Sequence, residues 1–217
     1  MFKHAVSGIV LAAVVGVVPV FGQESQQLPE PKKSGGMPVM EALQKRHSSR
    51  AFLDRALSAE TLSSLLWAAN GISRPDGRRT APTAINVQDT DVYAILATGA
   101  YLYDAKANAL TLAASGDHRA LAGKQDFVKT APVNLIFVQD RKRLGERLEG
   151  DKELFAGVHA GAICQNVYLF CASEGLACVV RRNIDIPALH KALNLRPDQV
   201  IVLGQTVGYP APAEAAH

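Results

Sequence analysis

Cysteine is scarce in this sequence, and its three residues fit no common metal or disulfide pattern. There is no CxxC motif and no cysteine–histidine spacing typical of a zinc site. Cys164 and Cys171 are separated by roughly 10 Å of rise along a predicted helix, too far for a disulfide. With Cys178 they make an odd count, whereas a disulfide framework normally has an even one. We therefore expect buried free thiols that act as small hydrophobic side chains.

The chain also lacks a strong excess of charge and a platform of stacked aromatics. The formal net charge is +3, and the aromatic residues are seven Phe, five Tyr and one Trp. The basic run 141–143 contains no aromatic residue, so a solvated helix face explains it better than nucleic-acid binding. With 217 residues and 48% hydrophobic composition, the chain is long enough for one domain with a substantial core.

Residues 1–22 have the layout of a secretory signal peptide. Lys3 and His4 precede an uncharged, mostly apolar run that ends in small residues at Gly22. We expect cleavage near Gly22–Gln23 and an exported protein, periplasmic or secreted. An uncleaved anchor is the alternative, because the run is just long enough to span a bilayer. The interruption by Pro19 disfavours a permanent span.

Residues 23–36 are polar and rich in proline, lysine and glycine, which predicts a flexible linker. The folded domain is expected over residues 37–212, beginning with a short helix around 40–44. A second helix follows, with Ser58 as its N-cap and Asn70-Gly71 as a left-handed stop.

Hydrophobic runs later in the chain predict the strands of a sheet. The expected strands are 92–97, 100–103, 110–113, 133–138, 176–180 and 200–207. Short helices are expected near 118–121, 140–149 and 186–193. Because hairpin strands and helices mix without strict βαβ alternation, we predict an α+β fold with a mostly antiparallel central sheet flanked by helices.

Two further segments stand out. Residues 72–91 form a long Gly-, Pro- and Arg-rich loop, of a length that is often functional, and Asn86 offers an amide that donates and accepts hydrogen bonds. Residues 155–172 predict a helix that is apolar nearly all round, so it must be buried in a core or against a partner subunit. We interpret its His159 as a packed residue rather than a proton donor.

The stretch from Lys45 to Phe52 combines basic side chains with a hydroxyl. In an extended segment, Arg46, Ser48 and Arg50 point to one side and suit a phosphate. A solvated helix end, whose basic residues complement the helix dipole, is the alternative. Taken alone, the stretch favours the helix end.

A series of motifs over residues 38–210 resembles the nitroreductase (FMN-dependent oxidoreductase) superfamily. One of them resembles the family's Pro-Ser-x-x-Asn-x-Gln loop, and another its C-terminal Gly-Tyr-Pro. The motifs are, in chain order, Arg46-His47-Ser48-Ser49-Arg50-Ala51-Phe52, Pro82-Thr83-Ala84-Ile85-Asn86-Val87-Gln88, the helix 160–169, Glu174-Gly175-Leu176-Ala177 and Gly208-Tyr209-Pro210.

This resemblance implies an FMN-binding homodimer with active sites at the subunit interface. The implied roles are phosphate and ribityl binding by Arg46, His47, Ser48 and Arg50, and contact with the ring edge by Asn86 of the same or the other subunit. The backbone of Val179, Val180 and Arg181 would face the flavin ring, with Arg181 as the candidate cation near its N1–O2 side. No catalytic side chain and no metal is implied, because the flavin carries the redox chemistry.

The sequence departs from the family pattern at three places. The Lys/Arg pair that often follows Gly-Tyr-Pro is not found after Pro210, so Arg181 or Arg182 is a candidate substitute. Asp89-Thr90 stands where Pro-Trp is common, and Ala177 replaces the last glycine of Gly-Leu-Gly.

We expect an FMN-dependent oxidoreductase that uses NAD(P)H, or another electron donor, to reduce a nitroaromatic, quinone or related small-molecule acceptor in a ping-pong flavin cycle. A flavin-dependent dehydrogenase or oxidase of the same fold, and a non-catalytic flavin- or ligand-binding protein, are the alternatives. Neither nucleic acid nor, after signal cleavage, a membrane is expected as a partner.

Overall fold

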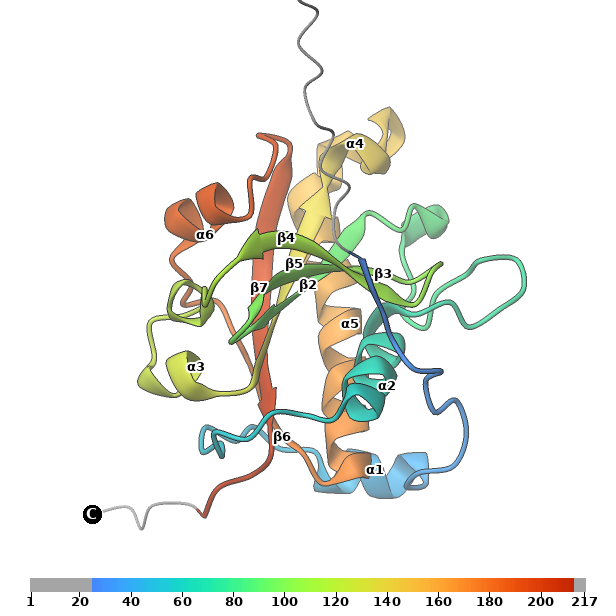
Figure 1. The fold of residues 1–217 in the computed structure, drawn as a ribbon. Coiled ribbons are helices and arrows are strands. Elements are labelled where there is room, and N and C mark those ends of the chain that lie inside the picture. The colour runs from blue at the N-terminus through green and yellow to red at the C-terminus, as the bar shows by residue number, and fades with distance from the viewer. Residues whose placement is uncertain (1–24, 213–217) are drawn as a thin grey trace, which may run out of the picture.

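A seven-stranded antiparallel sheet forms the centre of the structure, a computed structural model that describes residues 25–212 (Figure 1). The strand order is β1-β4-β3-β2-β5-β7-β6. The predicted signal peptide lies outside the described residues. The strands are β1 (Ser25–Gln27), β2 (Thr90–Leu96), β3 (Gly99–Asp104), β4 (Ala109–Ser115), β5 (Val133–Asp140), β6 (Ala177–Arg181) and β7 (Gln199–Gly208).

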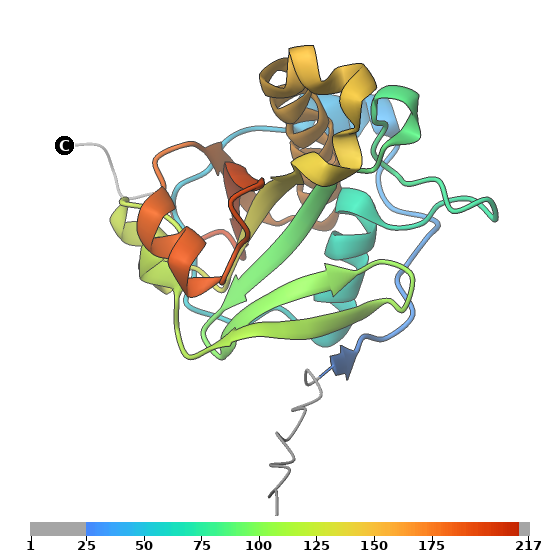
Figure 2. The same cartoon turned by 90° about the horizontal axis from the view of Figure 1, so that it is seen from above.

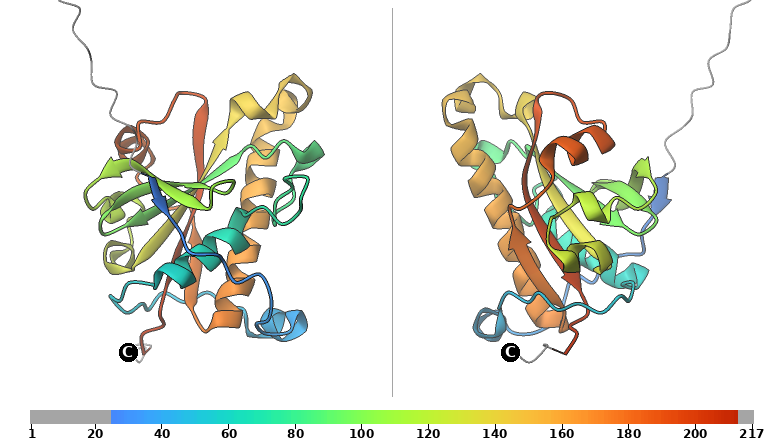
Figure 3. Two further views of the ribbon diagram at one scale, coloured as in Figure 1. Left: turned by 45° about the vertical axis from the view of Figure 1, so that its right-hand side comes forward. Right: turned by 90° about the vertical axis from the view of Figure 1, so that its left-hand side faces the viewer.

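Helices cover both faces of this sheet (Figure 3). On one face lie α1 (Val39–Lys45), α2 (Ala59–Asn70) and α5 (Lys152–Glu174); on the other lie α3 (Asp126–Thr130) and α6 (Ile186–Ala192). A short α4 (Arg141–Leu144) and the 3₁₀ turns η1 (Ala84–Asn86), η2 (Arg119–Leu121) and η3 (Glu146–Asp151) complete the described elements. The predicted fold class, α+β with a mostly antiparallel sheet, is confirmed.

The central strand β5 shows why the sheet is covered on both faces. All eight of its residues are buried, and strand neighbours alternate between the faces. Leu135 and Phe137 contribute to the core under α2 and α5, whereas Ile136 and Val138 contribute to the core under α6. The apolar residues 135–138 therefore serve both faces of the sheet, although the neighbouring strands are antiparallel.

The N-terminus of α2 is capped as its sequence predicts, and α5 ends at a glycine. Ser58 caps α2 by accepting a hydrogen bond from Thr61 N at 3.2 Å. Gly175 ends α5 in the left-handed conformation at φ 67°. Although α5 is long and apolar enough to cross a membrane, its sheet-facing side is buried in the core.

The left-handed stop predicted for Asn70-Gly71 is wrong. Gly71 has φ −74°, a value open to any residue. A Cβ at this position would lie 2.3 Å from Trp67 Cδ1, so lack of space requires the glycine. Trp67 is held there by a hydrogen bond from its Nε1 to Ile72 O at 3.0 Å.

Two other helix predictions need correction. The segment near 118–121 forms only the 3₁₀ turn η2. The helix expected over 140–149 is split into α4 and η3, because Gly145 adopts φ 74° and cannot continue a right-handed helix.

Residues 25–36 pack against the domain, which differs from the flexible linker predicted for 23–36. β1 pairs with β4 at the sheet edge beside the β3–β4 hairpin (Figure 2). Leu28 is buried in the main core, and Ser63 Oγ donates to Pro29 O at 2.6 Å. The pairing of β1 with β4 and the buried Leu28 side chain hold this segment in place, although its polar composition is typical of a linker.

Replacement of Leu28 by Ala should therefore destabilise the domain. We expect a loss of about 3 kcal/mol in the free energy of unfolding, because the change leaves a cavity in the core. Urea denaturation measures this loss, and the exposed Gln26→Ala is the control, with a change within about 0.5 kcal/mol. A Leu28→Ala protein as stable as the wild type would restore the linker interpretation.

Candidate functional site

Tyr168 of α5 joins the arginine-containing segment 46–52 to the edge strand β6. Its hydroxyl accepts a hydrogen bond from Val180 N at 3.0 Å and lies 2.8 Å from Ser48 Oγ. Either hydroxyl can act as the donor in the contact between Tyr168 and Ser48. Tyr168 therefore links Ser48 to the backbone of β6.

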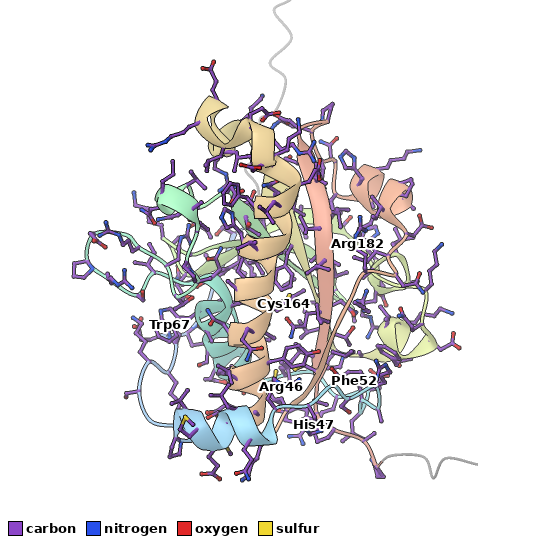
Figure 4. All side chains as sticks on the ribbon, turned by 180° about the vertical axis from the view of Figure 1, so that it is seen from behind. Arg46, His47, Phe52, Trp67, Cys164 and Arg182 are labelled. Carbon is purple, nitrogen blue, oxygen red and sulfur yellow. The ribbon has the colours of Figure 1, made fainter. Side chains whose placement is uncertain are left out.

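Arg46 and Ser48 lie on the same side of their segment, as the alternation predicts. The Arg46 guanidinium carbon is 5.1 Å from the centroid of the Tyr168 ring, the same residue that Ser48 contacts. Ser49, between Ser48 and Arg50, instead donates its backbone N–H to Cys178 O of β6 at 2.9 Å. Arg46, His47 and Phe52 lie together near the C-terminal end of α5 (Figure 4).

The positive charge of this segment is not compensated locally. Over residues 25–212, no carboxylate lies within ion-pair distance of Arg46, Arg50 or Arg182. The neighbouring Lys45, by contrast, pairs with Glu41 at 2.8 Å. Guanidinium groups without a carboxylate partner, in a segment that also carries a serine hydroxyl, are suited to an anion.

A cavity of about 280 Å³ lies beside this segment, between α5 and β6. His47, Tyr168 and Cys178 are among its lining residues. His47 is exposed, and its Nδ1 lies 2.9 Å from Lys45 O. The structure thus places Arg46, His47 and Ser48 together, beside the backbone of Val180.

Arg181 points away from this group. Its side chain is buried, with Nε donating to Thr206 Oγ1 at 3.0 Å and Nη2 to Asn134 Oδ1 at 2.7 Å, while Nη1 donates to Ala122 O. Burial lowers the pKa of Arg181 to about 10. The geometry does not support Arg181 as a cation beside a flavin, because its donors are already used on the α6 face of the sheet.

Arg182 is the exposed arginine at the end of β6 (Figure 4). Arg182 follows directly after the last residue of β6 and is exposed, whereas Arg181 is buried. Of the two arginines considered as substitutes for a missing basic pair, Arg182 is the accessible one.

Asn86 lies away from Ser48 within one chain. It is exposed on η1, whose Ala84 N donates to His159 Nε2 at 2.9 Å. Because His159 and Tyr168 are nine residues apart on α5, the two contact points are separated by roughly 13 Å along the helix. The structure therefore does not bring Asn86 and Ser48 together in a single copy.

The loop around Asn86 carries a basic cavity of its own. Arg74, Arg78, Arg79 and Asn86 line an open cavity of about 690 Å³. Arg79 Nε donates to Gln88 Oε1 at 2.9 Å, and Gln88 N donates to Thr83 Oγ1 at 3.0 Å. These bonds hold the long loop 72–91, which its length and composition suggested as a functional segment, in one conformation.

Two features of the site were missed from sequence. The bridging role of Tyr168 could have been suspected, since a tyrosine in an otherwise apolar helix needs a hydroxyl partner. The second is a buried pair of Asp89 with His159, whose Oδ1 and Nδ1 lie 2.7 Å apart. His159 is packed in the interior, as expected, and is only 1% exposed.

The three cysteines are buried free thiols, as the sequence predicts. Burial raises the pKa of Cys164 to about 12 and also raises that of Cys171. Neither thiol is thus poised as a nucleophile. Among the residues that the structure describes, no cluster of His, Cys, Asp and Glu could hold a metal.

Comparison with known proteins identifies the family. The sequence matches the Nitroreductase family over residues 43–209, which contain the Arg46–Phe52 segment, Asn86 and Gly208-Tyr209. The chain belongs to the nitroreductase family. The predicted resemblance is confirmed, and membership supports an oxidoreductase.

Individual relatives agree with this assignment. A crystal structure of a nitroreductase-like protein from Ralstonia eutropha is 39% identical, with a TM-score of 0.83, over 90% of this chain and 93% of that one. A nitroreductase-like protein of Methanocaldococcus jannaschii is 30% identical over 64% of this chain and 75% of its own length. A Desulfovibrio desulfuricans nitroreductase-like protein, crystallised with FMN, shares the fold at 23% identity and a TM-score of 0.58, over 84% of this chain and 93% of that one.

Removal of the Tyr168 hydroxyl should loosen the nitroreductase-family segment 46–52 from β6. We expect Tyr168→Phe to lower the free energy of unfolding by about 1–3 kcal/mol, because Val180 N–H loses its acceptor in a partly buried site. The control is Tyr101→Phe, whose hydroxyl bonds Thr98 at the surface and should cost less than about 0.5 kcal/mol. Equal effects of the two changes in urea denaturation would contradict the bridging role.

Proposed function

We propose that this nitroreductase-family protein is an FMN-dependent oxidoreductase. In this proposal NAD(P)H is the electron donor, and a nitroaromatic, quinone or related small molecule is the acceptor, in a ping-pong cycle. The observation that carries the proposal is the pair of unpaired arginines, Arg46 and Arg50, flanking Ser48 in the motif-bearing segment beside β6.

The residues present fit the phosphate of FMN. A dianionic phosphate needs fixed cations and hydroxyl donors, which Arg46, Arg50 and Ser48 offer. The Tyr168 hydroxyl fixes the serine, so the site is ordered before a ligand arrives. His47 lines the adjacent cavity. When bound, FMN would supply the hydride and electron chemistry, so no side-chain acid or base need be assigned.

We further propose that Asn86 acts from a second copy of the chain. The exposed position of Asn86 on η1 leaves its amide accessible to another copy. The outer face of α5 supports it too: Leu154 is 61% and Val158 53% exposed. A homodimer that buries this face would complete each site with residues from both subunits.

Export remains part of the proposal. It rests on the basic start and apolar run of residues 1–22, which have the layout of a cleaved signal. The mature protein would then fold and bind its cofactor after transport, in the periplasm or outside the cell.

The absorbance spectrum of the mature protein tests the function. We expect the two visible flavin bands in the purified protein, or after addition of FMN, and bleaching when NADH or NADPH is added without air. A colourless protein that takes up no FMN would contradict the proposal. Bound flavin that NAD(P)H does not reduce would favour a dehydrogenase, an oxidase or a passive flavin-binding protein.

The phosphate anchor has a separate test. Arg46→Ala combined with Arg50→Ala should weaken FMN binding at least about a hundredfold, since two charge-assisted bonds are lost. Flavin fluorescence quenching measures the affinity. Lys124→Ala with Lys129→Ala removes the same charge from an exposed surface near α3 and serves as the control. Unchanged FMN affinity in the arginine variant would refute the anchoring role.

The proposed dimer predicts a change in association state. Val158→Asp places a charge on the outer face of α5 and should convert a dimer to a monomer at micromolar concentration, because a buried unpaired charge is costly. Sedimentation equilibrium measures the mass, with the exposed Thr130→Asp on α3 as the control. A wild-type protein that is monomeric would contradict the dimer and the shared site.

A further inference from the structure

The turn that carries Asn86 adopts an unusual backbone. Ile85, Asn86 and Gln88 all have positive φ, at 43°, 60° and 48°. The left-handed region is disfavoured for non-glycine residues, and a β-branched residue such as Ile85 is a clear outlier there. Contacts from elsewhere must hold such a turn, and strained turns of this kind gather at binding sites.

A buried Asp89–His159 pair provides one such contact. His159 Nδ1 lies 2.7 Å from Asp89 Oδ1, and His159 Nε2 lies 2.9 Å from Ala84 N, the first residue of the turn η1. His159 is 1% exposed and Asp89 0%. The imidazole therefore joins α5 to the strained turn without access to water.

The backbone donor decides where the imidazole carries its proton. Ala84 N–H can only donate, so His159 Nε2 must be without a proton and accept. The single proton of the neutral ring then lies on Nδ1 and is donated to Asp89. Asp89 thus selects the tautomer that binds the turn, in the way that a carboxylate orients a functional histidine.

Asp89 is itself fixed by other elements. Gln139 Nε2 of β5 donates to Asp89 Oδ2 at 2.8 Å, and Asp140 N donates to Asp89 O at 2.7 Å. The carboxylate is thus anchored to the central strand of the sheet. The chain of contacts runs from β5 through Asp89 and His159 to the turn.

We propose that His159, oriented by Asp89, is a positioning residue that locks the η1 turn so that Asn86 is presented outward for the cofactor. Asn86 and Ile85 are both exposed on this turn, while its amide end at Ala84 is tied inward. The inference rests on the proposed flavin function for its ligand, but the lock itself can be observed without any ligand. His159 touches neither cofactor nor substrate in this scheme.

Two substitutions at one position test the lock. His159→Leu keeps an apolar volume but removes both bonds. His159→Gln keeps a carboxamide that can accept from Ala84 N–H and donate to Asp89. The full chain is used, and Leu65→Ala, in the α2 core, supplies a destabilised control whose turn contacts are intact.

The first readout is amide hydrogen exchange of Ala84 in protein without added flavin. We expect exchange at Ala84 to become at least about tenfold faster in His159→Leu, and to stay near the wild-type rate in His159→Gln and Leu65→Ala. Unchanged protection of Ala84 in His159→Leu would overturn the proposal, as would loss of protection in the Gln variant equal to that in the Leu variant.

The second readout is FMN affinity under conditions in which every variant is folded. A positioning role predicts about tenfold weaker binding for His159→Leu, recovery in His159→Gln and no change in Leu65→Ala. A purely structural role predicts that affinity follows stability, so equal losses in His159→Leu and Leu65→Ala would overturn the proposal. A wild-type protein that binds no FMN, with the expected exchange pattern, would refute the proposed function while retaining the lock on the turn.

Discussion

The packing of α5 against the central sheet is the constraint on which the rest of the structure depends. One helix face is buried over β6, β7 and β2, and two polar side chains on that helix reach opposite ends of the candidate site. Tyr168 holds Ser48 and β6, whereas His159 holds the turn of Asn86. Because a helix is a rigid spacer, these two ends stay a fixed distance apart.

That fixed distance keeps the arginine cluster and the turn of Asn86 apart within one copy of the chain. A cluster of uncompensated arginines lies at one end of α5 and an amide-bearing turn at the other. In the proposed dimer, each copy would contribute one half of each site. The exposed outer face of α5, with Leu154 and Val158, is where a second copy would supply the missing half. The proposed dimer would therefore be needed for cofactor binding, since it would bring the arginine cluster of each copy next to the Asn86 turn of the other copy.

Buried polar groups carry much of this organisation. Arg181, Asn134 and Thr206 form one network on the α6 face, and Asp89, Gln139 and His159 form another near α5. Each member makes at least one hydrogen bond, which limits the penalty of burying it, but Gln139 Oε1 has no partner among the described residues. Such networks fix backbone positions more narrowly than apolar packing does, which suits segments that must present a ligand site.

The sequence by itself determined the fold class, the cap at Ser58, the buried thiols and the motifs that place the chain in its family. These features are local or periodic, so they are visible in residue order. Only the tertiary structure decided that the segment around Leu28 belongs to the core, that Arg181 faces inward while Arg182 is exposed, and that Asp89 meets His159. Those outcomes depend on contacts between residues far apart in the chain, for which single-residue propensities carry no information.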